Sequence, residues 1–246
     1  METQTHCVVF DGVSKAYGDL QVFSDLSVSL PKGVTTAIVG ASGSGKTTLL
    51  QMVNALEKPD AGSVFVNGDP VPQAELEPFR RRIGYAVQGA GLFPHMSAKE
   101  NVTLVAGLEG WSQETIDQRF TTLLAAMELP LDVAQRLPRQ LSGGQQQRLG
   151  LCRALMLEPE LLLLDEPFSA VDPITRLGLY ERFELVQKQN QVSTLLVTHD
   201  LREAKRLADY LLILDKGAMV QAGTPEYVLQ NPASAYVERL IESQLA

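Results

Sequence analysis

Eight consecutive residues in the first quarter of the chain have types and spacing that suit phosphate. They read Gly40-Ala41-Ser42-Gly43-Ser44-Gly45-Lys46-Thr47 and match the pattern G-x4-G-K-[S/T]. An apolar run precedes them and an amphipathic run follows, which is the context that the motif needs. Glycines let backbone N–H groups face phosphate oxygens, while a helix N-terminus and Lys46 add positive charge. The segment predicts a phosphate cradle in which the Thr47 hydroxyl suits Mg²⁺.

Two adjacent carboxylates, Asp165 and Glu166, follow the apolar run Leu161–Leu164. A continuous apolar run predicts a strand buried on both faces of a parallel sheet, and ligands of such sheets bind at the carboxyl ends of the strands. Successive strand side chains point to opposite sides, so the two acids must do different work. We expect Asp165 to hold Mg²⁺ and Glu166 to act as the base for a water that attacks a γ-phosphate. The alternative is a pair of solvated acids at a strand end, which the presence of the phosphate loop disfavours.

A second glycine-rich segment, Leu141-Ser142-Gly143-Gly144-Gln145, lies upstream of these acids. Ser142 is a favourable N-cap residue, and Leu149, Cys152 and Leu155 follow it at helical spacing. The N–H groups of the first helical turn could bind phosphate. The segment therefore fits either a second anion site or an ordinary helix cap.

Short strands and helices must position these residues. The sequence predicts strands over Cys7–Phe10, Leu26–Leu30, Val34–Val39, Gly62–Val66, Ile83–Val87, Leu161–Leu164 and Thr194–Val197, and a hairpin over Leu211–Val220. Turns are expected at Asp11-Gly12, Asn67-Gly68 and Asp215-Lys216-Gly217. Helices are expected over Thr47–Leu56, within 89–159 and within Pro225–Ala246.

Composition restricts the class of protein. The 246 residues, 45% hydrophobic and 20% charged, suffice for one sizeable globular domain and exclude a disordered or collagen-like chain. The net charge of -8 disfavours nucleic acid and anionic lipid. Cys7 and Cys152 are far apart in the sequence, so we expect free thiols in a reducing compartment. Neither a signal peptide nor a membrane-spanning run is expected, and we interpret the chain itself as soluble and cytoplasmic.

In this order and spacing, the three motifs resemble those of the ATP-binding subunits of ABC transporters, over about Val8 to Gly223. The resemblance implies an α/β fold: a P-loop NTPase core with a mostly parallel sheet, an antiparallel β subdomain and an inserted helical lobe. It implies a single ABC ATPase domain over 1–246. Its core and β subdomain would occupy 1–88 and 160–223, its helical lobe 89–159 and its C-terminal tail 224–246.

The resemblance also assigns roles residue by residue, with ATP and Mg²⁺ as cofactors. The nucleotide would be bound by Tyr17, which stacks on adenine, and by Gly40, Ala41, Ser42, Gly43, Ser44, Gly45, Lys46, Thr47 and Thr48. Thr47, Gln88 and Asp165 would hold the metal, and Glu166, His199 and Lys46 would be catalytic. Ser142, Gly143, Gly144 and Gln145 would close over the ATP of a second subunit, with Asp172 in the dimer-contact loop Ser169-Ala170-Val171-Asp172.

A finer resemblance concerns the cargo. Arg82–Gln88, Gly91–Met96, Gly110-Trp111 and Asp172–Arg176 are similar to the ATPases of glycine betaine, choline and proline importers. Within this resemblance His95 fits coupling or packing rather than catalysis. Two features depart from the pattern: Gly89-Ala90 replaces a more polar pair, and no paired sensor modules follow the terminal hairpin, so sensing of ionic strength is not expected.

The resemblance thus implies an ATPase that energises the import of a quaternary amine or other osmoprotectant. Its implied partners are a second copy in a head-to-tail dimer or a paralogous ATPase, an integral membrane permease and, indirectly, an extracytoplasmic solute-binding protein. It would act on the cytoplasmic face of the inner or plasma membrane. Two alternatives stay open: an importer or exporter ATPase for another cargo, such as an amino acid, and a soluble ABC ATPase that acts on nucleic acid.

Overall fold

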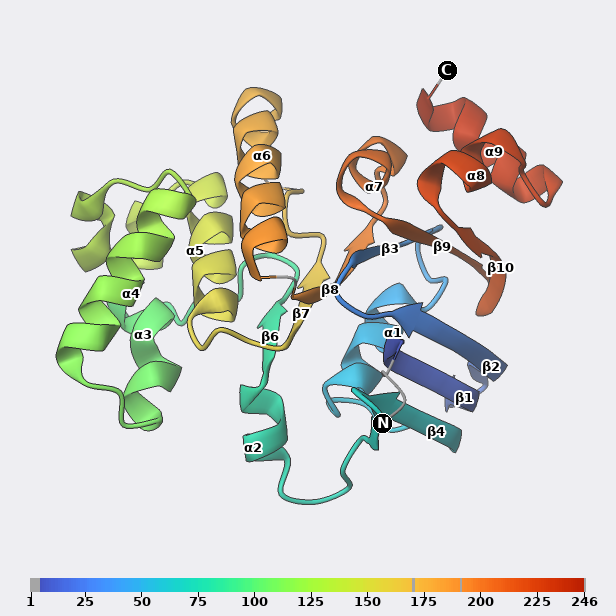
Figure 1. Ribbon diagram of the computed structural model, residues 1–246, viewed down its shortest axis with the longest axis horizontal. Helices are drawn as coiled ribbons and strands as arrows, with labels where there is room; N and C mark the ends of the chain where they lie inside the picture. The colour runs from blue at the N-terminus through green and yellow to red at the C-terminus, as the bar shows by residue number, and fades with distance from the viewer. Residues whose placement is uncertain (1–4, 170, 191, 246) are drawn as a thin grey trace. The chain divides into compact units, whose positions relative to one another are not determined.

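The computed structural model describes residues 5–169, 171–190 and 192–245 (Figure 1). It divides into two compact units, which are described separately below. Unit 1 comprises Met1–Arg80 and Gln191–Ala246, and unit 2 comprises Arg81–Asn190. The predicted boundaries, a core over 1–88 and 160–223 with a lobe over 89–159, stay a prediction.

Unit 1 contains an antiparallel sheet in the order β2-β1-β4-β5. Its strands are β1 (His6–Tyr17), β2 (Leu20–Pro31), β4 (Ala61–Val66) and β5 (Asp69–Pro70). Asn67 and Gly68 join β4 to β5 with φ of 50° and 86°, the two positive values that a tight hairpin turn requires. The predicted turn at Asp11-Gly12 is wrong, because β1 continues through it. Gly12 has φ 61° and the register shifts there, so the pair forms a bulge rather than a chain reversal.

The parallel strands of unit 1 are β3 (Thr35–Gly40), β8 (Ser193–Thr198) and β9 (Tyr210–Asp215), in the order β9-β3-β8. All residues of β3 and β8 are buried, as their continuous apolar runs predict. The hairpin partner of β9, β10 (Ala218–Gly223), is antiparallel to it. Lys216 and Gly217 make this turn with φ of 47° and 75°, at the predicted place.

Helices cover the parallel strands of unit 1. They are α1 (Lys46–Val53), α7 (Leu201–Leu207), α8 (Pro225–Gln230) and α9 (Ala235–Leu245), and α2 (Leu76–Arg81) ends in the first residue of unit 2. One apolar core joins β3 and β9 to α7, α8 and α9 (Figure 1), through Ala37, Val39, Leu201, Ala204, Leu211, Ile213, Val228 and Val237. The side chains from β3 and β9 in this core are odd-numbered because alternate strand residues share one face. The predicted helical tail is therefore packed on the sheet.

Unit 2 pairs two parallel strands, β6 (Ile83–Ala86) and β7 (Leu161–Asp165), with helices. The helices are α3 (Ala98–Leu108), α4 (Gln113–Ala126), α5 (Gly143–Leu155) and α6 (Pro173–Asn190), with short 3-10 turns at Leu131–Gln135 and Pro138–Gln140. The apolar stripe of α4 is buried at Ile116, Phe120, Leu123 and Leu124, as its spacing predicts. Helices α3 and α5 pack together, and α5 packs on β6. The sequence analysis does not anticipate α6 or α7.

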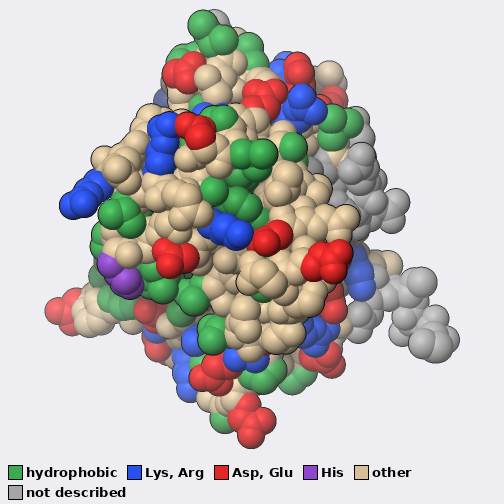
Figure 2. Space-filling view, turned by 90° about the vertical axis from the view of Figure 1, so that its left-hand side faces the viewer, with side chains coloured by type: hydrophobic (Ala, Val, Ile, Leu, Met, Phe, Trp, Pro, Cys, Tyr) green, Lys and Arg blue, Asp and Glu red, His purple; other side chains and the backbone are tan. Residues whose placement is uncertain are grey.

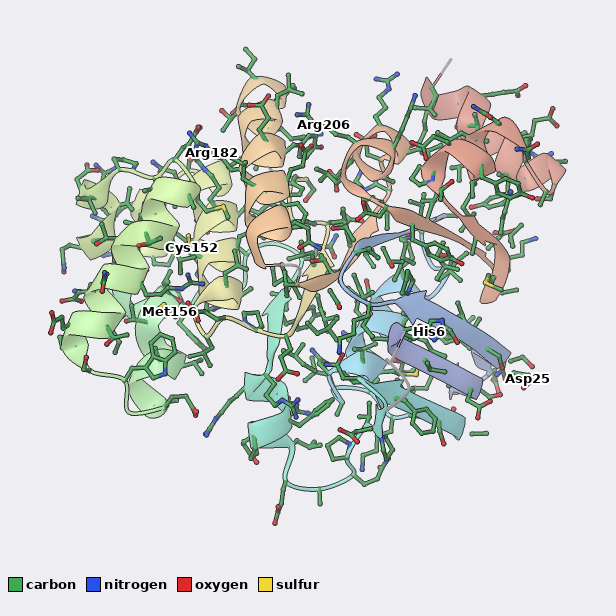
Figure 3. All side chains as sticks on the ribbon, in the orientation of Figure 1. His6, Asp25, Cys152, Met156, Arg182 and Arg206 are labelled. Atoms are coloured by element: carbon green, nitrogen blue, oxygen red, sulfur yellow. The ribbon has the colours of Figure 1, made fainter. Side chains whose placement is uncertain are left out.

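Both cysteines are free, as predicted, and both are buried. Cys152 lies on α5 (Figure 3) and Cys7 on β1, where its Sγ lies 3.3 Å from the Pro31 carbonyl oxygen. Burial raises the pKa of Cys7 to about 11 and that of Cys152 to about 12. Both thiols are therefore protonated at neutral pH.

A close backbone approach between β1 and β4 depends on glycine. Gly62 has φ 79°, and a Cβ there would lie 2.3 Å from the Gly12 carbonyl oxygen. Gly62→Ala should lower the free energy of unfolding by about 2 to 4 kcal/mol, because a left-handed backbone and a backbone clash both oppose the methyl group. The measurement is urea unfolding followed by circular dichroism.

The matched control is Gly107→Ala in α3, where a Cβ would meet nothing within 4 Å. Alanine there should stabilise the helix by about 0.5 to 1 kcal/mol. Equal unfolding midpoints for the two variants would contradict this account.

Candidate functional site

The phosphate loop of unit 1 connects β3 to α1. Strand β3 ends at Gly40 and α1 begins at Lys46. A Cβ at Gly40 would lie 2.2 Å from the Leu214 carbonyl oxygen, and one at Gly45, whose φ is 99°, would lie 2.5 Å from the Phe23 ring. Only glycine fits at these two positions, so neighbouring strands hold the loop close to the sheet.

The loop concentrates positive charge. Lys46 is 8% exposed, and its Nζ donates to the carbonyl oxygens of Gly40 and Ala41, each at 2.8 Å. Helix α1 has no acidic residue in its first turn, so no carboxylate there offsets the positive end of its dipole. Among the described residues, the buried Oγ of Ser44 has no hydrogen-bond partner. An ammonium, a helix N-terminus and an unsatisfied hydroxyl fit phosphate oxygens.

His199 lies at the same end of the parallel strands. Val39 is paired with Thr198, so Gly40 and His199 directly follow neighbouring residues of β3 and β8. The side-chain amide of Gln244 in α9 holds this connection at two points. It donates to the His199 carbonyl oxygen at 3.0 Å and accepts from Leu201 N at 2.6 Å. The backbone of His199 is thereby fixed to the C-terminal helix.

Tyr17 ends β1 in unit 1. Its partner across the β1–β2 hairpin is Leu20, and Gly18 in the turn has φ 59°. Tyr17 is 43% exposed, so part of it is open to solvent. The Nζ of Lys15 lies 5.0 Å from the ring centroid, which makes a cation–π contact.

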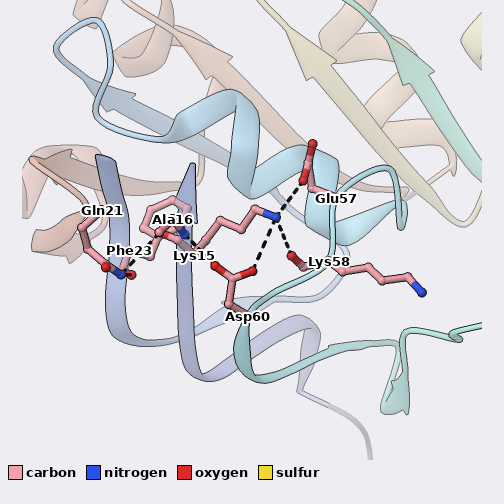
Figure 4. Close-up of polar contacts among 7 residues, drawn as sticks. All are labelled: Lys15, Ala16, Gln21, Phe23, Glu57, Lys58 and Asp60. Carbon is pink, nitrogen blue, oxygen red and sulfur yellow. Dashed lines mark hydrogen bonds and ion pairs between the residues drawn. The ribbon is translucent and has the colours of Figure 1, made fainter. Parts of the chain in front are cut away.

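Lys15 ties the end of this hairpin to the segment that follows α1 (Figure 4). Its Nζ lies 2.9 Å from Glu57 Oε2, 3.8 Å from Asp60 Oδ1 and 2.9 Å from the Lys58 carbonyl oxygen. The other carboxylate oxygen of Asp60 accepts from Ala16 N at 2.7 Å. The hydrogen bond to Glu57 raises the pKa of Lys15 above its usual value.

This cluster, which connects the Tyr17 strand to the chain just after α1, is not among the predicted site residues. The sequence does contain one signal for the contact between Lys15 and Tyr17. The two residues are two apart in a strand, so their side chains share a face. The acidic partners could not be inferred, since they lie about 40 residues away.

The acidic pair lies in unit 2. Asp165, at the end of β7, is 3% exposed, and Glu166 follows it with φ 50°. The side-chain amide of Gln88 donates to Glu166 Oε2 at 3.3 Å. Burial, followed by the charge of Asp165, raises the pKa of Tyr85 on β6 to about 12, so this phenol stays protonated. The structure thus brings together the predicted residues Gln88, Asp165 and Glu166.

The second glycine-rich segment forms the start of α5. Ser142 Oγ accepts from Gln145 N at 3.2 Å, and Gln145 Oε1 accepts from Ser142 N at 2.9 Å, which makes a reciprocal capping box. Ser142 and Gly143 are exposed. The cap interpretation is confirmed, and it leaves this helix N-terminus open to solvent.

Asp172 precedes α6 and is exposed. Its Oδ1 accepts from Thr175 N at 3.0 Å, and its hydrogen bonds to Thr175 hold its pKa below the usual range. Of the predicted dimer-contact loop, Ala170 lies outside the described residues.

The segment after Gln88 has an unusual backbone. Gly89, Ala90 and Gly91 all have positive φ, of 76°, 65° and 55°. Arg153 of α5 donates to the carbonyl oxygens of Ala90 at 3.1 Å and Gly91 at 2.9 Å, and its guanidinium lies 5.9 Å from the Phe93 ring centroid. The Gly89-Ala90 departure noted in the sequence thus falls where small residues adopt a left-handed backbone.

Metal binding would depend on oxygen donors from several residue types. Within the described part of the chain, three or more His, Cys, Asp or Glu never gather as a metal-binding group. Mg²⁺ commonly uses one or two carboxylates together with substrate phosphates and water. Within unit 2, Asp165 offers a carboxylate and Gln88 an amide oxygen, and within unit 1 the exposed Thr47 offers a hydroxyl.

Comparison with known proteins identifies the family. A model of the ABC transporter family matches residues 23–169, which is more than half of the chain. The chain belongs to the ABC transporter family. This match includes the phosphate loop, the cap of α5 and the acidic pair of this ABC domain. The α/β fold with its P-loop core, antiparallel sheet and helices is confirmed.

Individual relatives are similar over almost the whole ABC domain. It is 42% identical over 235 residues to the choline transport ATP-binding protein OpuBA of Bacillus subtilis, covering 95% of this chain and 62% of OpuBA. It is 41% identical over 232 residues to the glycine betaine uptake system ATP-binding protein YehX of Escherichia coli, covering 94% and 75%.

A solved structure has a similar fold. It is the dimeric post-hydrolysis state of the ATP-binding cassette MJ0796 bound to ADP and Pi, with 30% identity and a TM-score of 0.83. The match covers 89% of this chain and 98% of the other. Among the described residues of the ABC domain, no helix combines the length and hydropathy needed to cross a bilayer.

The Lys15 cluster gives a test of how unit 1 holds Tyr17. Lys15→Met removes the cation that Glu57 and Asp60 share. We expect the free energy of unfolding to fall by about 1 to 2 kcal/mol. The loss is modest because both carboxylates are partly exposed to solvent. Urea unfolding measures it. Lys205→Met, at an exposed position of α7, should stay within about 0.5 kcal/mol of the unchanged chain. Equal losses in both variants would rule out a specific role for the cluster.

Proposed function

We propose that this chain binds Mg·ATP and hydrolyses the γ-phosphate to energise a membrane permease that imports a small solute. The observation that carries the proposal is the phosphate loop, where the buried ammonium of Lys46 and the unpartnered Ser44 hydroxyl lie at the uncompensated N-terminus of α1. Such a cradle binds anionic phosphate through backbone N–H groups and charge.

In unit 1, the loop residues Gly40 to Thr48 would bind the phosphates, and Tyr17 would stack on adenine. The exposure of Tyr17 supports this role, and the cation–π contact with Lys15 favours one orientation of the ring. Lys46 would stabilise the charge that develops on the γ-phosphate. The position of His199, at the same strand ends as Gly40, supports a contact with that phosphate.

In unit 2, Glu166 would orient the attacking water and accept its proton. The amide of Gln88 holds the Glu166 carboxylate, which favours one orientation of the base. Asp165, Gln88 and Thr47 would hold Mg²⁺, which supplies charge neutralisation at the phosphate oxygens.

The working form would be a head-to-tail dimer, with a second copy or a paralogous ATPase. The N-terminus of α5, with Ser142 and Gly143 exposed and Gly144 half-buried, would contact the ATP of the partner, and Gln145 would shape the cap. Asp172 would lie at the dimer contact. The dimeric MJ0796 cassette with ADP and Pi supports this arrangement.

The permease would place the chain at the cytoplasmic face of the membrane, with an extracytoplasmic solute-binding protein as an indirect partner. Unit 2 exposes large hydrophobic side chains at Phe93, Leu108 and Leu131, and Figure 2 shows hydrophobic side chains among acidic and basic ones on a face of its helices. Surfaces of this mixed kind suit a protein partner. The cargo would be a quaternary amine, a proposal supported by the names of OpuBA and YehX.

Two variants separate binding from hydrolysis. Glu166→Gln should bind ATP normally and lower kcat by about 10² to 10⁴, because the base is lost. Lys46→Ala should weaken ATP binding by about 10- to 100-fold, because a charge-assisted contact to phosphate is lost. ATP titration and phosphate release measure the two quantities. Rapid turnover by Glu166→Gln, or unchanged affinity in Lys46→Ala, would overturn these assignments.

Uptake of labelled solutes tests the cargo. Cells with the permease and this chain should accumulate choline or glycine betaine, and the Lys46→Ala variant should abolish the accumulation because ATP no longer drives transport. Proline and several amino acids serve as comparison solutes in the same cells. Lys46-dependent uptake of only an amino acid would replace the quaternary amine as cargo, and Lys46-dependent efflux would reverse the direction.

A further inference from the structure

Gln147 of α5 has a buried side chain that reaches the backbone of the acidic pair. The residue is 4% exposed, and its Nε2 donates to the Glu166 carbonyl oxygen at 2.9 Å and to Ser169 Oγ at 3.2 Å. All three residues belong to unit 2. The sequence analysis gives Gln147 no role.

The backbone that Gln147 contacts is strained. Glu166 has φ 50°, a left-handed conformation that a residue with a Cβ adopts only where its surroundings enforce it. Its carbonyl oxygen also accepts from Ser169 Oγ at 2.9 Å and Ser169 N at 3.3 Å. Gln147 and Ser169 thus both bind the carbonyl oxygen of the peptide after Glu166.

The two ends of Glu166 are held by different amides. Gln88 donates to its carboxylate and Gln147 to its backbone carbonyl. Because the backbone conformation sets the direction of the Cα–Cβ bond, release of the carbonyl would let the carboxylate leave its position even with Gln88 in place.

Helix α5 connects this contact to the exposed cap. Gln147 lies four residues after Gly143, so the two occupy one face of the helix, one turn apart. A shift of the first turn of α5 is transmitted to Gln147 by helical hydrogen bonds rather than by a flexible loop.

We propose that Gln147 is a positioning residue that joins the Ser142–Gly144 cap of α5 to the backbone of the base Glu166. The inference rests on the proposed function, because it takes the cap as the contact with the partner's nucleotide and Glu166 as the base. Docking of the cap on a nucleotide would then set the orientation of Glu166 through one rigid turn of helix.

The test is steady-state ATP hydrolysis by Gln147→Met in the full chain. Methionine keeps the length of the side chain and removes the donor without adding charge. We expect kcat to fall by about 10-fold or more while KM and the affinity for ATP change by less than about 3-fold, because the phosphate loop is unaffected. In a Glu166→Gln background, Gln147→Met should cause no further loss, since its effect acts through Glu166.

Gln146→Met is the matched control. Gln146 is the adjacent residue of the same helix, and its amide donates to the carbonyl oxygens of Pro138 and Leu141 rather than to Glu166. Its kcat should stay within about 2-fold of the unchanged chain. Ser169→Ala, at an exposed position, provides a second variant should Gln147→Met not fold, and it should also lower kcat without changing ATP affinity.

The outcomes separate the two proposals. An unchanged chain that neither binds nor hydrolyses ATP would refute the proposed function and this inference with it. An active chain whose Gln147→Met and Ser169→Ala variants keep full kcat would overturn the inference alone. An additional loss of similar size in the Glu166→Gln background would also overturn it, because Gln147 would then act independently of the base.

Discussion

The burial of β3 on both faces determines where the phosphate loop of unit 1 lies. Each of its residues is buried, and its neighbours β8 and β9 run parallel to it. Parallel strands end at one edge of a sheet, so the phosphate loop and His199 emerge side by side there. The close approach of Gly40 to the Leu214 carbonyl then removes any room for a side chain at the start of the loop. The packing of β3 thus determines where the loop and its positive charge lie.

In unit 2, by contrast, side-chain N–H groups of α5 hold segments with a strained backbone. Arg153 and Gln147 both lie on α5, and both donate to main-chain carbonyls in segments with positive φ. One segment follows Gln88 and the other contains Glu166. Long polar side chains on a helix can reach loop backbone that hydrophobic packing does not hold. Through Arg153 and Gln147, α5 therefore holds the segment after Gln88 and the segment that contains Glu166. The cost of a left-handed backbone is about 1 to 2 kcal/mol per residue, comparable to one or two of these hydrogen bonds.

The parts of the fold that local sequence encodes were predictable. The phosphate loop, the buried strands and the turn at Asn67-Gly68 each depend on a few consecutive residues. The bulge at Gly12 was mistaken for a turn because the same residue types serve both. Helix α6 was missed because Ile174 and Leu177 are exposed while Leu179 and Phe183 are buried, which blurs its periodicity. The contacts of Lys15, Arg153 and Gln147 join distant parts of the chain, so the sequence alone could not pair them with their partners.

The two hydrogen bonds between Gln244 and the connection from β8 to α7 have a dynamic consequence. The amide of Leu201 is the first of α7 and in an isolated helix would face water. Here Gln244 of α9 accepts it, and also binds the carbonyl of His199. Exchange of the Leu201 amide hydrogen with solvent therefore requires that Gln244 release it, by rotation of its side chain or by movement of α9. Movement of the C-terminal helix away from α7 breaks both contacts, so it frees the Leu201 amide and the His199 carbonyl together.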